Sequence, residues 1–145
     1  MKWIDLPPVW LVGFLFLGAT MPRVGEVFYK QALMGQCFVA VGVLFMGLAV
    51  VQMRRQRTTV IPHRTAEHLV TRGIFTQTRN PIYLGDAFVL VGALLYWETQ
   101  LLAFVLVPAF MWVITVRFIK PEEAMLQERF GDDFTQYCAA VRRWL

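Results

Sequence analysis

The sequence is poor in charged residues and rich in apolar ones. Only 17% of its 145 residues are charged, whereas 57% are hydrophobic. A soluble domain of this size needs more charge to cover its surface, so the composition predicts one membrane domain that covers residues 1–145. The net charge of +4 does not indicate nucleic-acid binding, because the Lys and Arg residues flank apolar runs, as the positive-inside rule requires.

Cysteine and histidine, the usual ligands of structural zinc, are also scarce. Cys37 lies in an apolar run and Cys138 in the polar tail, with no CxxC pair, so both are expected to be free and buried. His63 and His68 stand in a basic stretch without a matching carboxylate pattern, so no metal site is predicted. The chain also lacks a Gly-rich phosphate loop, a GxSxG turn and a Ser/His/Asp order, which leaves no signal for a nucleotide-binding loop or a catalytic triad.

Long apolar stretches are what the sequence does contain. Each is close to the roughly 20 helical residues that cross a bilayer core of about 30 Å. We therefore predict an all-α integral membrane protein with four transmembrane helices, at residues 3–21, 32–53, 81–97 and 101–119. The second stretch carries Gly35, Gly42 and Gly47, where another helix could approach closely, although their spacing is not a strict GxxxG.

The polar stretches predict how the chain is oriented. Residues 54–80 are rich in arginine, whereas the connector Glu98-Thr99-Gln100 has no Lys or Arg, so the loop is expected on the cytoplasmic side and the connector on the far side. Pro121 is expected to end the fourth helix. Residues 121–145 then have apolar side chains at helical spacing, which predicts an amphipathic cytoplasmic helix interrupted near Gly131. The expected location is the bacterial inner (plasma) membrane, with the active site facing the cytoplasm.

Two polar clusters, residues 79–86 and 117–123, lie at the predicted cytoplasmic boundary, and we expect them to meet and bind one charged cofactor. Arg79 precedes a helix whose N–H groups, together with the guanidinium, suit a carboxylate. Asp86 lies about one turn into the third span, where an ionisable group is a functional candidate, although it could also cap the helix or pair with an arginine. Arg117 is the candidate for binding an acceptor carboxylate.

The two clusters belong to blocks that resemble a known family. Residues 69–75 and 79–85, and then Pro121-Glu122-Glu123 and Val141-Arg142-Arg143-Trp144, are similar to the isoprenylcysteine carboxyl methyltransferases and their phospholipid methyltransferase relatives. The resemblance covers roughly residues 58–145. It implies a small integral-membrane enzyme that uses S-adenosylmethionine, with cofactor contacts from Arg79, Asn80, Pro81, Tyr83, Leu84, Gly85, Glu122 and Glu123. Asn80 stands where the family usually has histidine, and because asparagine takes no charge at neutral pH, a general base at this position is in doubt.

Several functions stay open at this stage. The favoured one is methyl transfer from S-adenosylmethionine to a lipophilic or lipid acceptor taken from the bilayer, which could be a carboxylate, a phospholipid amine or a phenol. Membrane sterol reductases share a related Arg-x-Pro-x-Tyr-x-Gly block and use a nicotinamide cofactor, so a reductase is the second possibility. The third is a non-catalytic membrane scaffold whose polar motifs only cap helices. The adjacent Glu122 and Glu123 favour methyl transfer, although two acids after a span are more often a solvated face.

Overall fold

The computed structural model describes residues 6–22, 29–56 and 68–145, and all regular structure within them is helical. His63 lies outside these ranges, as do residues 57–67 of the loop predicted at 54–80 and the first residues of the span predicted at 3–21. The elements are α1 (Pro7–Thr20), α2 (Tyr29–Arg55), η2 (Gly73–Thr76), α3 (Pro81–Tyr96), α4 (Gln100–Ile114), η3 (Thr115–Ile119), α5 (Lys120–Phe130) and α6 (Asp132–Ala140). Each predicted apolar span therefore coincides with a helix, and the first three agree within a few residues at either end, whereas the helix of the fourth span continues past residue 119.

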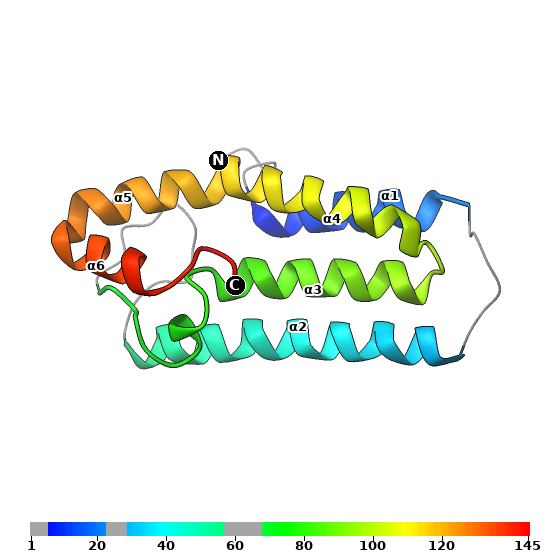
Figure 1. Ribbon diagram of the computed structural model, residues 1–145, viewed down its shortest axis with the longest axis horizontal. Helices are drawn as coiled ribbons and strands as arrows, with labels where there is room; N and C mark the ends of the chain where they lie inside the picture. The colour runs from blue at the N-terminus through cyan, green and yellow to red at the C-terminus, as the bar shows by residue number, and fades with distance from the viewer. Residues whose placement is uncertain (1–5, 23–28, 57–67) are drawn as a thin grey trace.

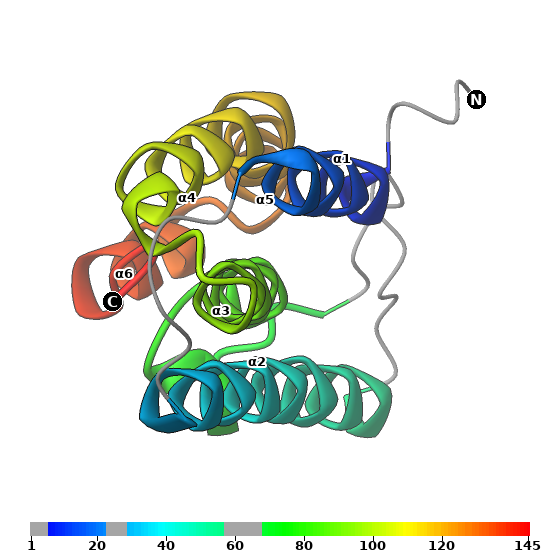
Figure 2. The ribbon, with the colours of Figure 1, turned by 90° about the vertical axis from the view of Figure 1, so that its right-hand side faces the viewer.

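Helix α3 is the centre of the bundle. Helices α1, α2 and α4 each pack against it, with α2 on one side and the α1–α4 pair on the other (Figures 1 and 2). Its sequence is apolar on all sides except at Asp86, and a helix of this kind is suited to a position surrounded by other helices. Most of its residues are buried, including Leu90 and Leu94, which have no exposed surface.

The contact between α2 and α3 is made by glycines. A Cβ added to Gly35 would lie 2.6 Å from the Gly92 carbonyl oxygen, and one added to Gly42 would lie 2.5 Å from that of Gly85. Gly35 and Gly42 are seven residues apart on α2, and Gly85 and Gly92 are seven residues apart on α3. Seven residues is the period at which one face of a helix recurs when helices pack at a small angle. The glycines thus let the two backbones touch, whereas a Cβ on Gly47 would meet nothing within 4 Å.

The other side of α3 packs against α1 and α4 through larger side chains. Leu90 and Leu94 meet Phe110 and Ile114 of α4 in one buried cluster, and Phe14 of α1 packs edge-on against Phe110 with 5.4 Å between the ring centroids. Large apolar side chains also cover the outside of the bundle, where Phe104 is 81% exposed. This outward apolar surface is what a bilayer would cover.

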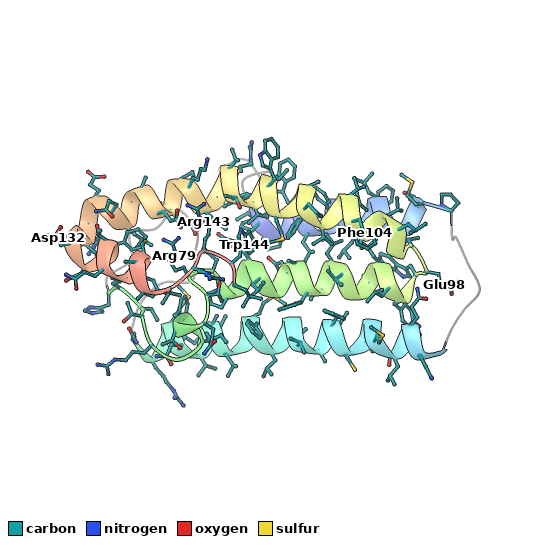
Figure 3. The ribbon with its side chains drawn as sticks, in the orientation of Figure 1. Arg79, Glu98, Phe104, Asp132, Arg143 and Trp144 are labelled. Carbon is teal, nitrogen blue, oxygen red and sulfur yellow. The ribbon has the colours of Figure 1, made fainter. Side chains whose placement is uncertain are left out.

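Two helices are long and apolar enough to cross a membrane, Lys30–Arg55 and Leu101–Phe130, and two others, Pro7–Thr20 and Pro81–Tyr96, are apolar but shorter. Glu98 lies at one end of the bundle, and Arg79 and Arg143 lie at the other (Figure 3). Glu98 ends α3 with a positive φ of 62°, and the N–H groups of Glu98 and Thr99 bond the carbonyls of Leu95 and Leu94. The tight turn at this end needs no polar cluster.

The expectation that Pro121 ends the fourth helix is wrong. The chain stays helical through η3 into α5, and Ile119 keeps helical dihedrals of φ −65° and ψ −47°. The turn before the proline is π-type: the N–H of Lys120 reaches the Thr115 carbonyl, one residue further back than in an α-helix. Pro121, which has no N–H to donate, follows directly, so the wider turn lets the helix continue. The result is one long helix, Leu101–Phe130, that extends beyond the bundle (Figure 1).

The C-terminal region also differs from a single helix over residues 121–145. The interruption near Gly131 is confirmed, since that residue has a φ of +52° and separates α5 from α6. However, α6 ends at Ala140, and residues 141–145, which we call the strap, are not helical. Both cysteines are free, as expected, but Cys37 is exposed and Cys138 only half-buried, because the first faces outward from a helix whose inner face is occupied by glycines.

Candidate functional site

The strap crosses the beginning of α3 and is fastened there by its backbone carbonyls. The Arg142 carbonyl accepts a hydrogen bond from the Arg79 N–H at 3.0 Å. The Arg143 carbonyl accepts two, from the Thr78 hydroxyl at 3.1 Å and from Asn80 Nδ2 at 2.9 Å. Trp144 packs against the buried cluster of α3 and α4. The chain's last residues therefore hold a fixed path beside the residues that open α3 (Figure 3).

Two arginines and one glutamate meet under the strap. Arg143 binds Glu123 with two hydrogen bonds, Nε to Oε1 at 3.0 Å and Nη2 to Oε2 at 2.6 Å. Arg79 Nη1 lies 3.3 Å from the same Oε1. We call Arg79, Glu123 and Arg143 the Glu123 cluster. Its carboxylate belongs to α5, whereas the two guanidiniums come from the residue before α3 and from the strap, so three separate parts of the chain converge.

Burial and charge differ within the Glu123 cluster. The side chains of Arg79 and Glu123 are 13% and 17% exposed, and that of Arg143 is 35% exposed. The hydrogen bonds with Glu123 raise the pKa of Arg143, while its partial burial acts in the opposite direction. The Arg143 guanidinium thus stays charged across the range in which the protein would work.

Arg79 has one unsatisfied donor. Its Nη1 donates to Cys138 Sγ of α6 as well as lying beside Glu123. Its Nε is buried and has no hydrogen-bond partner among the described residues. A buried donor of this kind costs free energy unless something accepts its hydrogen, which makes it a mark of a functional position.

The second glutamate is held by a tyrosine. The Tyr83 hydroxyl donates to Glu122 Oε1 at 2.8 Å, while the Tyr83 ring lies in the buried cluster with Ala87 and Leu90. Asp86, three residues further along α3, is 5% exposed. The start of α3 thus carries a hydroxyl fixed on Glu122 and, three residues further along the helix, a buried carboxylate.

A hydrogen bond joins helix α6 to η2, in the stretch that precedes α3 and leads to Arg79. The Tyr137 hydroxyl donates to the Phe75 carbonyl of η2 at 2.7 Å. Burial raises the pKa of Tyr137 far above its ordinary value; the nearby Arg79 opposes this rise and Cys138 adds to it. Because the tyrosine stays neutral and bonded, it fixes α6, and with it Cys138, against the loop that presents Arg79.

The structure brings some of the predicted residues together and gives others a different place. Arg79, Tyr83, Glu122 and Glu123 converge as expected. Asn80 fastens the strap, and Pro81, Leu84 and Gly85 are buried, with Gly85 against α2. Arg117 lies over the Trp10 ring of α1, with 5.5 Å from its Cζ to the ring centroid.

Sequence reasoning missed Thr78, Cys138 and Arg143. Arg143 stands in the closing block that resembles the family, and that block was the signal that could have found it. No signal pointed to Thr78, whose importance depends on where the strap lies. Among the described residues, no group of three or more His, Cys, Asp or Glu side chains could hold a metal ion.

The phospholipid methyltransferase family model matches residues 30–133, which include α2 from its second residue, all of α3 and α4, and Arg79, Glu122 and Glu123. The chain belongs to this family. The assignment confirms the resemblance found in the sequence, and it makes the protein a methyltransferase of a lipid-related membrane family. A search of curated proteins found no match. A search of solved structures found none either.

Proposed function

We propose that this family member transfers a methyl group from S-adenosylmethionine to a lipophilic acceptor at the cytoplasmic face of the membrane. The observation that carries the proposal is the 3.3 Å approach of Arg79 to Glu123, because it joins the two polar blocks that the family resemblance singled out. Residues distant in the chain form one compact group of opposite charges, which suits a small zwitterionic ligand better than a structural anchor.

The groups present fit the chemistry of this methyl donor, which has a carboxylate, an ammonium, a sulfonium and a ribose diol. Arg79 has a buried, unpaired Nε–H that a carboxylate could accept from. Glu122 and Glu123 supply acceptors for an ammonium or for ribose hydroxyls. Tyr83 orients Glu122 through its hydroxyl. Asn80, Pro81, Leu84 and Gly85 then shape the site indirectly, by fixing the strap and the start of α3.

S-adenosylmethionine supplies an already activated methyl group, so the protein need only align the reactants and exclude water. In this proposal the strap, together with helix α6, which the Tyr137–Phe75 hydrogen bond holds in place, would exclude water from the aqueous side. Asp86 and Arg117 are the residues proposed to act on the acceptor. Arg117 would attract a carboxylate acceptor, whereas Asp86, buried in α3, would take the proton from an amine acceptor.

The orientation follows from the two ends of the bundle. In this proposal α1, α2, α3 and α4 all cross the bilayer as one membrane domain, with α1 and α3, roughly 21 and 24 Å long at 1.5 Å per residue, completed by the turns that flank them. The end with Arg54, Arg55 and the Glu123 cluster faces the cytoplasm, and the Glu98 turn faces the other side. A lipid acceptor would approach α3 laterally from the bilayer.

Isothermal titration of the detergent-purified protein with S-adenosylmethionine and S-adenosylhomocysteine tests the proposal. We expect saturable binding that Glu123→Gln weakens about tenfold or more, because the variant removes a charge-assisted contact. The matched control is Glu128→Gln, an exposed acid on the same helix, which should leave the affinity unchanged.

The competing functions give other results in the same experiment. Saturable binding of NADPH but not of S-adenosylmethionine in this titration would favour a reductase of the sterol type. Absence of binding by either ligand to a folded protein would favour a scaffold, and equal loss of affinity in the Glu123 and Glu128 variants would rule out the assigned site.

A further inference from the structure

We propose that Arg143 is a built-in competitor of the methyl donor: its guanidinium occupies Glu123 and must leave before the ammonium of the ligand can bind there. This inference rests on the proposed function, since it concerns how the same site admits its ligand. It assigns a role to the strap, which lies beyond the match to the family model, because that match ends at residue 133.

The geometry of the Arg143–Glu123 pair supports competition. Both carboxylate oxygens of Glu123 are taken, one by Arg143 Nη2 at 2.6 Å and the other by Arg143 Nε at 3.0 Å. Arg79 approaches the second of these oxygens as well, at 3.3 Å. A ligand ammonium that seeks this carboxylate therefore meets two cations, and one of them has to withdraw.

Arg143 is the cation that can withdraw. Its side chain is 35% exposed, whereas that of Arg79 is 13% exposed and also contacts Cys138. If Arg79 moved away, the largely buried carboxylate of Glu123 would lose a charged partner, and the loop before α3 would be disturbed. A partly exposed guanidinium loses little when it turns toward water, because solvent already screens it.

The strap can stay in place while the Arg143 side chain moves. Its backbone is fastened independently, by the Thr78 and Asn80 hydrogen bonds to the Arg143 carbonyl, and Trp144 is packed on the core. The moving part is thus one side chain on a fixed backbone. Such an arrangement lowers affinity for the donor and for the demethylated product alike, since both have the same ammonium, and it helps the product to leave.

Titration of the Arg143→Gln variant with three ligands tests this role. We expect S-adenosylmethionine and S-adenosylhomocysteine to bind about 3- to 10-fold more tightly than to the wild type, and by the same factor for both. Affinity for 5′-methylthioadenosine, which lacks the amino-acid end, should not change. Arg142→Gln is the matched control, because the neighbouring arginine is exposed and contributes only its carbonyl to the strap contacts.

The other outcomes overturn the inference. Unchanged or weaker binding of S-adenosylmethionine to Arg143→Gln would show that Arg143 does not compete, and tighter binding of all three ligands would show a general loosening of the site. If Arg143→Gln does not fold, Arg143→Lys, which keeps the charge but not the two parallel hydrogen bonds, should give a smaller gain of the same sign. Binding of no ligand by the wild type or by either variant would remove the proposed function itself, whereas normal wild-type binding with no gain in the variants would remove only the competitor.

Discussion

The α2–α3 interface and the polar end of the bundle hold the same central helix by different means. Along most of its length α3 touches α2 at glycine pairs, with backbone against backbone, and a side-chain hydrogen bond, from Gln31 Nε2 to the Leu95 carbonyl at 3.2 Å, joins the two helices near their far end. At its beginning α3 is held by the strap, by α5 and by the loop before it, through hydrogen bonds and the Glu123 cluster. The α2–α3 contact depends on glycines, which have no side chain to keep the backbones apart. The contact at the start of α3 depends on the correct placement of charged and polar side chains.

The difference determines which region can serve a ligand. A backbone-to-backbone interface has only one arrangement, because any displacement opens a gap that nothing fills. Ion pairs with partly exposed partners can exchange one cation for another at small cost. The same helix is therefore rigid where it crosses the bundle and adaptable at the end where the proposed cofactor binds.

The largest predicted effect comes from filling the glycine interface. Gly42→Val places a side chain where even a Cβ would lie 2.5 Å from the Gly85 carbonyl, so α2 and α3 must separate. We expect a loss of about 3 kcal/mol or more in the free energy of unfolding. Unfolding in mixed micelles with increasing sodium dodecyl sulfate, followed by far-UV circular dichroism, measures it.

Gly47→Val is the control on the same helix. A Cβ at Gly47 meets nothing within 4 Å, so we expect a change within about 0.5 kcal/mol. Equal losses in the two variants would mean that the glycines act through helix propensity, and the close approach of α2 to α3 would then not be what holds this region.

A smaller effect is expected at a glycine of the polar end, for a different reason. Gly131→Ala adds a Cβ that meets no atom within 4 Å, but the residue has a φ of +52° and a ψ of −120°, which L-residues rarely adopt. We expect a loss of about 1–2 kcal/mol from backbone strain alone. The same unfolding assay measures it, and Gly131→Asn should lose less than Gly131→Ala, because asparagine tolerates positive φ better.

The sequence allowed the helices to be located but not their ends. Apolar length alone predicts a helix wherever a bilayer could hold one, and this placed α2 and α3 within a few residues. It could not show that a π-type turn at Thr115–Ile119 lets the chain pass Pro121, because the deciding hydrogen bond is a property of the folded backbone. The sequence indicated that another helix could approach Gly35 and Gly42, but it did not identify their partners, because Gly92 and Gly85 lie on another helix.

The candidate site was predictable only where residues fall in contiguous blocks. Arg79, Tyr83, Glu122 and Glu123 stand in two such blocks, and charge complementarity on one membrane side was enough to predict that they meet. The contacts that the strap makes at this site were not predictable, because Arg143 reaches Glu123 only once the chain has turned back at Gly131 into α6. Long-range placement of the C-terminal residues is decided by α6 packing on η2, which no local pattern encodes.

The smallest predicted effect at neutral pH concerns the Tyr137 contact that docks α6, and this effect depends on pH. Burial raises the pKa of Tyr137, so the folded protein keeps this proton at a pH where the unfolded chain, with a tyrosine pKa of about 10, has lost it. The protonated Tyr137 therefore contributes fully to the free energy of unfolding below about pH 10. This contribution is lost as the pH rises further, by up to about 1.4 kcal/mol per pH unit. Tyr137→Phe cannot titrate: it should lose about 1 kcal/mol at pH 7 with the hydrogen bond to Phe75, and then fall less steeply than the wild type between pH 10 and 11.5. The two unfolding curves should thus approach each other and cross between pH 10 and 11.5, and parallel curves would show that Tyr137 ionises in the folded protein as readily as in the unfolded chain.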